Sequence, residues 1–119
     1  MSMKATIRQV DSVTVVDISG RITLGEGCSQ LRELIREQLG KGNRYVLLNL
    51  ADVTYIDSSG IGELVSGYTA VSNQGGQLKL LNLTKKVHDL LQITKLYTVF
   101  DVHDDEAKAV TSFSKAANA

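Results

Sequence analysis

The alternation of apolar and polar residues changes its period several times in the first half of the chain, and each change predicts a new element. Two segments rich in β-branched residues come first, an edge strand near residues 6–10 and a strand over 13–18, which we expect to form a hairpin. A helical pattern begins at Gly27 and stops at Gly40 and Gly42. Its apolar stripe consists of Cys28, Leu31, Ile35 and Leu39.

The second half repeats strand and helix patterns in alternation. Residues 45–50 are almost continuously apolar, as in a strand covered on both faces, and 52–56 lead from it into a sharp turn. The next apolar stripe has helical spacing and consists of Ile61, Leu64, Val65, Tyr68 and Val71. Beyond Gly75-Gly76, we expect a strand over 78–81, a helix capped by Thr84, a strand over 97–102 and a helix from 104 to about 114.

This order, β-β-α-β-α-β-α-β-α, predicts an α/β fold with a mixed, mostly parallel sheet and about four helices. The hairpin must be antiparallel, whereas strands joined through helices usually run parallel. At 119 residues the chain has the size of one domain, and no linker or repeat divides it. We therefore expect a single domain over 1–119, with an ordered core of about 4–114.

Composition and charge exclude several classes of function. Thirteen basic residues balance thirteen acidic ones, so the positive field that binds nucleic acid is missing. Cys28 has no cysteine partner, and with His88 and His103 it makes no metal cluster. No apolar signal core or membrane-spanning run occurs, so we expect a cytoplasmic protein without direct membrane insertion. No nucleophile elbow frames a serine, and Asp52 and Asp57 do not form a glycosidase pair. With no catalytic constellation, we expect a protein that is not an enzyme and has no cofactor.

The most informative segment is Asp57-Ser58-Ser59-Gly60-Ile61-Gly62, between the central strand and the second helix. Functional loops in α/β proteins lie at such strand ends. Asp57 can cap the helix through its carboxylate and leave both serine hydroxyls in the first turn. Gly60 and Gly62 each cost about 1 kcal/mol relative to alanine in a helix, which predicts that a protein surface or a phosphate approaches the backbone closely.

Two interpretations of the serines remain open on residue chemistry alone: they initiate the helix, or they accept a phosphate. A phosphate on Ser59 adds roughly −1.5 to −2 charges near the positive end of the helix dipole, which tolerates them. The same charges would stand close to Asp57 and would repel an acidic or tightly packed partner surface. Modification would then switch binding without unfolding the domain.

Residues from about 6 to 114 resemble a STAS domain of the anti-sigma factor antagonist type. The similarity rests on residues 48–50 and 53–62, with Gly75-Gly76-Gln77-Leu78 and Val87-His88-Asp89-Leu90-Leu91 in the expected places. The order of elements agrees as well.

The resemblance implies a regulatory switch. It implies that an anti-sigma factor with serine kinase activity phosphorylates Ser59, with Ser58 as the fallback position, and that a phosphoserine phosphatase restores the hydroxyl. The unmodified form would bind the anti-sigma factor and release the sigma factor. Partner contacts are expected from Thr23, where several relatives carry an acidic residue, and from Asp57, Ser58, Ser59, Gly60, Ile61 and Gly62.

A second class of function also follows from the resemblance. STAS domains occur as scaffolds of stressosomes and as accessory subunits of lipid or anion transporters. A third class, nucleotide binding, lacks the phosphate-binding loop that would support it.

Overall fold

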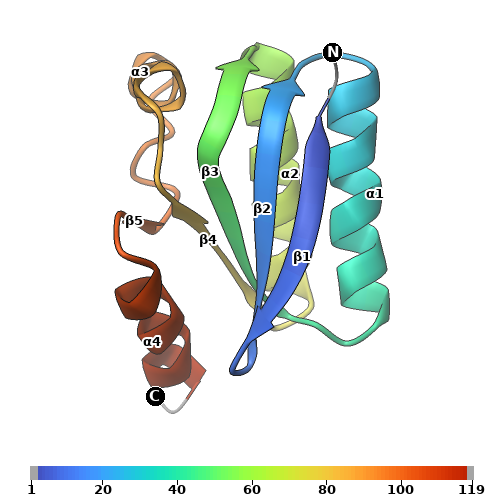
Figure 1. The fold of residues 1–119 in the computed structure, drawn as a ribbon, viewed down its shortest axis with the longest axis vertical. Helices are drawn as coiled ribbons and strands as arrows, with labels where there is room; N and C mark the ends of the chain where they lie inside the picture. The colour runs from blue at the N-terminus through green and yellow to red at the C-terminus, as the bar shows by residue number, and fades with distance from the viewer. Residues whose placement is uncertain (1–2, 118–119) are drawn as a thin grey trace.

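The computed structural model describes the backbone of residues 3–117 and the side chains of residues 3–113. The elements in chain order are β1 (Lys4–Val10), β2 (Val13–Ile22), α1 (Glu26–Gly40), β3 (Tyr45–Ile56), α2 (Ser58–Asn73), β4 (Gln77–Leu81), α3 (Lys85–Ile93), β5 (Val102–His103) and α4 (Glu106–Ala117). The strands form one sheet in the order β1-β2-β3-β4-β5, in which β1 runs antiparallel to β2 and the other described pairs are parallel (Figure 1). The predicted α/β class with a mixed, mostly parallel sheet is confirmed.

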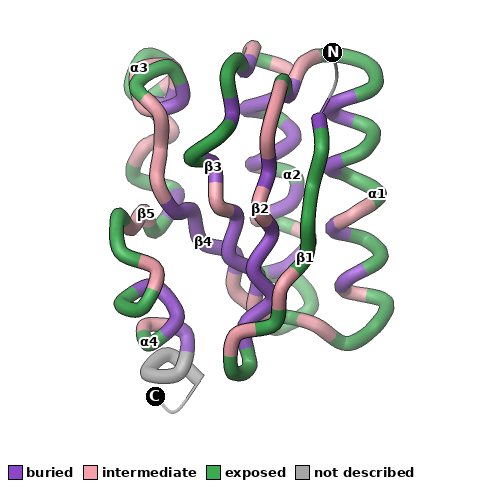
Figure 2. The backbone as a smooth tube through the Cα atoms, viewed as in Figure 1, coloured by how far each residue is buried: buried purple, intermediate pink, exposed green. Residues whose placement is uncertain are grey.

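Helices cover the sheet unequally on its two faces. Alternate strand residues such as Val16 and Leu48 face the larger core, which α1, α2 and α3 cover. Their neighbours Val15 and Leu47 face a smaller core closed by Phe113 of α4. Figure 2 shows the resulting pattern, with buried backbone running through β2, β3 and β4 while β1 at the sheet edge stays largely exposed. The nearly continuous apolar run of β3 is explained by this burial on both faces.

The last predicted strand is wrong in extent. We expected a strand over 97–102, but β5 contains only Val102 and His103. The chain leaves α3 through Lys95, which has a positive φ of 61°, and the backbone N–H of Val99 then donates to the carbonyl of Leu96 in a turn. The turn lets Phe100 pack edge-on against Tyr68 of α2, with ring centroids 5.6 Å apart. Burial of an aromatic side chain therefore overrides strand propensity here.

The end of β2 also differs from the sequence expectation and helps to position the site. The strand continues past residue 18 to Ile22, with register shifts against β3 between Asp17 and Ser19 and between Gly20 and Arg21. Gly20 has a φ of 93°, a backbone conformation that a residue with a side chain adopts only with strain. Irregularities of this kind bend a strand. They bring the loop after Ile22 to the N-terminal end of α2.

No helix in the described part of the chain is long and apolar enough to cross a membrane.

Candidate functional site

Asp57 organises the N-terminus of α2. It has an extended backbone (φ −109°), and its Oδ1 accepts a 2.8 Å hydrogen bond from the backbone N–H of Gly60. The predicted capping role is therefore confirmed. Its Oδ2 accepts a second bond, 3.1 Å long, from the backbone N–H of Leu24 in the loop between β2 and α1. One carboxylate thus ties two loops together at the carboxyl end of the sheet.

This arrangement keeps the carboxylate negatively charged. Partial burial of Asp57 raises its pKa, but the backbone N–H groups of Gly60, Leu24 and Ser59 together outweigh that effect, and the pKa of Asp57 lies below its usual value. The start of a helix favours negative charge for the same reason, because its first N–H groups have no partner inside the helix.

The serines next to Asp57 differ in exposure. Ser58 is exposed and Ser59 is half-buried, both in the first turn of α2. Thr23 is half-buried in the neighbouring loop, where its carbonyl accepts a hydrogen bond from the backbone N–H of Cys28. The structure therefore brings Thr23 to the same end of the sheet as the Asp57–Ser59 segment. The two segments lie more than thirty positions apart in the sequence, as the 33-residue separation of the Leu24–Asp57 bond shows.

Gly60 and Gly62 have opposite surroundings. A Cβ on Gly60 would overlap the carbonyl oxygen of Ile22 and lie 2.6 Å from Cγ1 of Ile56, so the close approach predicted from the sequence comes from the chain's own β2 and β3. A Cβ on Gly62 would meet nothing within 4 Å. Ile61 is 2% exposed and belongs to the core. Of the run expected to meet a partner, Gly60 and Ile61 thus face the interior and Gly62 faces outward.

Comparison with known proteins identifies the family of this fold and site. The family model described as "STAS domain" matches residues 4–109. The chain belongs to the STAS domain family. A Bacillus subtilis relative named anti-sigma-B factor antagonist is 30% identical over 102 residues, which are 86% of this chain and 92% of the relative.

Solved STAS structures agree with the fold. A Thermotoga maritima structure, titled as a candidate anti-sigma factor antagonist, superposes with a TM-score of 0.85 at 24% identity and covers 92% of this chain and 94% of that one. The Bacillus cell fate determinant SpoIIAA, in its phosphorylated form, superposes with a TM-score of 0.71 at 19% identity and covers 92% of this chain and 98% of that one. At these identities the match shows that the architecture is shared.

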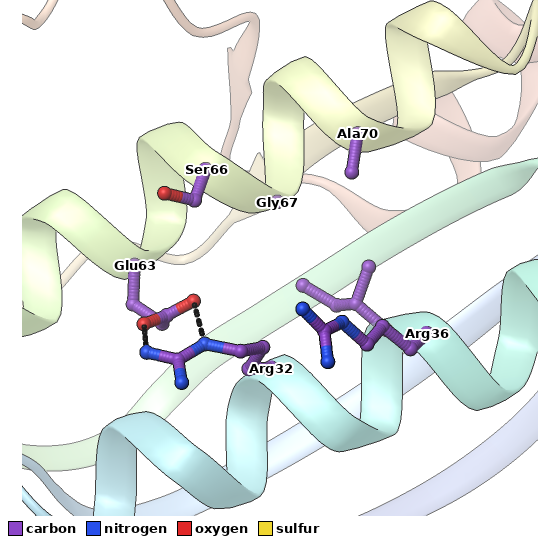
Figure 3. Close-up of a pocket in the computed structure, with 7 residues that line it drawn as sticks. Arg32, Arg36, Glu63, Ser66, Gly67 and Ala70 are labelled. Carbon is purple, nitrogen blue, oxygen red and sulfur yellow. Dashed lines mark hydrogen bonds and ion pairs between the residues drawn. The ribbon is translucent and has the colours of Figure 1, made fainter.

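An ion pair with a buried carboxylate lies one helical turn beyond the serines of this STAS domain. Glu63 of α2 is 8% exposed, and its carboxylate accepts two bonds from Arg32 of α1, 2.7 Å from Nη2 and 3.3 Å from Nε. Figure 3 shows the pair at one end of a groove between the two helices. The groove encloses about 220 Å³, and its lining residues are Arg32, Ile35, Arg36, Glu63, Ser66, Gly67 and Ala70.

Sequence reasoning missed this ion pair and the bond from Leu24. The Arg32 side chain lies off the apolar stripe of its helix and is 49% exposed, yet it reaches across to Glu63. The available signal was a single acidic residue, Glu63, inside the apolar and glycine-rich stretch of α2. A charge in such a position rarely stays buried without a partner.

Cys28 lies close to the same acidic groups and is buried, as its place on the apolar stripe predicted. Burial raises the pKa of its thiol, and the nearby charges of Asp57 and Glu63 raise it further. Such a thiol stays protonated and unreactive. Within the described residues, no three His, Cys, Asp or Glu side chains come together as metal ligands.

Proposed function

We propose that this STAS domain is an anti-sigma factor antagonist controlled by phosphorylation of Ser59. In the unphosphorylated form, the exposed surface around Asp57, Ser58 and Ser59 binds an anti-sigma factor that is also a serine kinase, and the bound sigma factor is released. The observation that carries the proposal is the pair of serines in the first turn of α2, fixed by Asp57, in a chain whose relatives bear the antagonist name.

The chemistry belongs to the partner. The kinase transfers the γ-phosphoryl group of its ATP to Oγ of Ser59, the hydroxyl proton leaves, and ADP remains on the kinase. The antagonist contributes the hydroxyl of the half-buried Ser59, in a helix start that Asp57 caps, and is not itself a catalyst. A phosphatase then hydrolyses the phosphoserine and restores the hydroxyl. We place this cycle in the cytoplasm, where ATP is available and Cys28 stays reduced.

The effect of the phosphate follows from its neighbours. The positive end of the α2 dipole tolerates an anion, so the fold remains intact. Asp57 precedes Ser59 by two residues and Glu63 follows it by one helical turn, so the phosphate joins two carboxylates already present. A partner surface that fits the neutral serine would then lie against closely spaced negative charges. Binding is weakened because the phosphate must lose its hydration water and because the charges repel acidic groups of the partner.

Mass spectrometry of the protein isolated from its native host tests the proposal. Intact mass and peptide mapping are compared for wild type, Ser59→Ala and the matched control Ser58→Ala. We expect the wild-type protein and Ser58→Ala to carry a phosphate. We expect Ser59→Ala to carry none, with no other serine phosphorylated in its place. A phosphate that disappears only in Ser58→Ala would assign the phosphorylation site to Ser58 instead of Ser59.

Absence of phosphate during growth, starvation and stress would contradict the switch. That result would favour a constitutive scaffold or transporter subunit, because such roles need a stable surface and no modification cycle. A pull-down with unphosphorylated protein that captures no ATP-binding kinase would contradict the partner assignment.

A further inference from the structure

Two positive charges share one exposed aromatic ring at the switch end of the sheet. The guanidinium carbon of Arg21, on β2, lies 4.7 Å from the ring centroid of Tyr55. The ammonium nitrogen of Lys86, in the first turn of α3, lies 4.9 Å from the same centroid. Arg21 and Tyr55 are paired in the register of β2 and β3, so this contact follows directly from the sheet.

These cations have no acidic partner of their own. Among the residues that the structure describes, neither Arg21 nor Lys86 takes part in an ion pair, whereas Arg8, Arg32, Lys79 and Lys85 each face a carboxylate within 3 Å. The two charges lie within about 10 Å of each other, on the order of one Debye length at physiological salt, so they repel. The repulsion is relieved when an anionic surface approaches both.

The same end of the molecule carries exposed apolar surface. Leu24 is 78% exposed, although its backbone is fixed by the hydrogen bond to Asp57, and Tyr55 is 37% exposed. Tyrosine and arginine are enriched among the residues that contribute most binding energy at the centre of protein interfaces. Arg21, Leu24, Tyr55, Ser58 and Lys86 together form what we call the Tyr55 patch, which is continuous with the serine switch along the chain and through the Asp57 bond.

We infer that the Tyr55 patch docks an acidic surface of the anti-sigma factor, with Arg21 and Lys86 steering the encounter and Leu24 and Tyr55 packing at its centre. The inference rests on the proposed function for the identity of the partner. It also gives phosphorylation a second effect, because new negative charge beside the patch weakens the positive potential that attracts an acidic partner.

The position of the cations suits a steering role. Both side chains are exposed, so their charges act on an approaching partner before contact. Both also lie against the Tyr55 ring, so little side-chain conformational freedom is lost on binding. Complementary charges of this kind raise the association rate more than they lower the dissociation rate, and the gain falls with added salt.

The test uses the full chain and the anti-sigma factor kinase captured by the unphosphorylated protein. Association and dissociation rates are measured at increasing NaCl for wild type, Arg21→Glu/Lys86→Glu and the control Lys41→Glu/Lys108→Glu. The control makes the same change in net charge at two exposed lysines, Lys41 just after α1 and Lys108 in α4. The C-terminal end of α1 and helix α4 both lie away from the N-terminal end of α2 (Figure 1). Circular dichroism confirms that each variant is folded.

We expect the Arg21→Glu/Lys86→Glu variant to associate at least about tenfold more slowly and to lose most of its salt dependence, with the control unchanged. Tyr55→Phe should retain binding, and Tyr55→Ala should dissociate faster. Rates equal to wild type in Arg21→Glu/Lys86→Glu would overturn the inference and leave the proposed function standing. Failure of the wild-type chain to bind any anti-sigma factor would overturn both.

Vesicles containing phosphatidylserine serve as a second probe. If the Arg21→Glu/Lys86→Glu variant loses binding to these vesicles but not to the anti-sigma factor, the partner of the Tyr55 patch is a membrane surface and the inference is overturned.

Discussion

Removal of the Asp57 carboxylate tests the structural basis of the site. In Asp57→Ala the cap of α2 is lost, which costs about 1 kcal/mol, and so are the bond to Leu24 and the favourable charge at the helix start. Together these losses predict a decrease of about 2 to 3 kcal/mol in the free energy of unfolding. Asp57→Asn keeps one acceptor oxygen, so it loses only the charge and one of the two bonds, about 1 to 2 kcal/mol.

Urea unfolding followed by circular dichroism measures these differences. With a denaturant slope of roughly 1 to 3 kcal/mol per molar urea, Asp57→Ala should unfold about 0.7 to 3 M earlier than wild type, with Asp57→Asn in between. Equal midpoints for wild type and Asp57→Ala, within about 0.5 kcal/mol, would refute the assigned role, since that is the range of neutral surface changes.

The pH dependence of the same comparison has a defined sign. The folded pKa of Asp57 lies below its usual value of 3.8, so around that pH the unfolded chain binds more protons than the folded one. The advantage of wild type over Asp57→Asn, which does not titrate, is therefore complete above about pH 5 and is lost as the pH falls through the lowered folded pKa. A difference between the two proteins that stays constant from neutral pH to about pH 3 would contradict this explanation.

Three further changes have expected outcomes. Gly60→Ala should lose about 2 to 3 kcal/mol of stability in thermal unfolding because its Cβ overlaps the carbonyl of Ile22, whereas Gly62→Ala should gain about 0.5 to 1 kcal/mol because its Cβ meets nothing. Phe113→Ala should lose about 3 to 5 kcal/mol, since the ring is fully buried, and amide exchange should rise throughout α4. Cys28 should react with a thiol reagent at least about 100-fold more slowly in the folded protein than in urea, because it is buried and its thiol pKa is raised.

Local patterns predicted most of this fold because the signals are themselves local. The 3.6-residue stripe in α1, the apolar run of β3 and the capping by Thr84 depend on neighbours in sequence, and all three occur as expected. The strand predicted over 97–102 was wrong because the deciding contact is not local. Its composition favours a strand, but the contact between Phe100 and Tyr68 joins residues 32 positions apart and favours a turn.

The same distinction holds for the candidate site. Asp57 as a helix cap was predictable, because cap and recipient are three residues apart. The bond from Leu24, the pairing of Arg32 with Glu63 and the meeting of Arg21 and Lys86 on Tyr55 were not, because each depends on how distant elements are placed in the fold. The glycine signal was detected correctly at Gly60, but only the structure shows that the approaching group is Ile22 of the same chain.

The two sides of the first turn of α2 show how the proposed phosphorylation of Ser59 would change binding without changing the fold. Gly60 and Ile61 hold the turn against the sheet, while Ser58 and Gly62 face outward. A phosphate on Ser59, as proposed above, would add its charge at the positive end of the α2 dipole and leave the buried contacts of Gly60 and Ile61 unchanged. The stability of the domain therefore depends on the inner side of the turn, and under the proposed function recognition depends on the outer side.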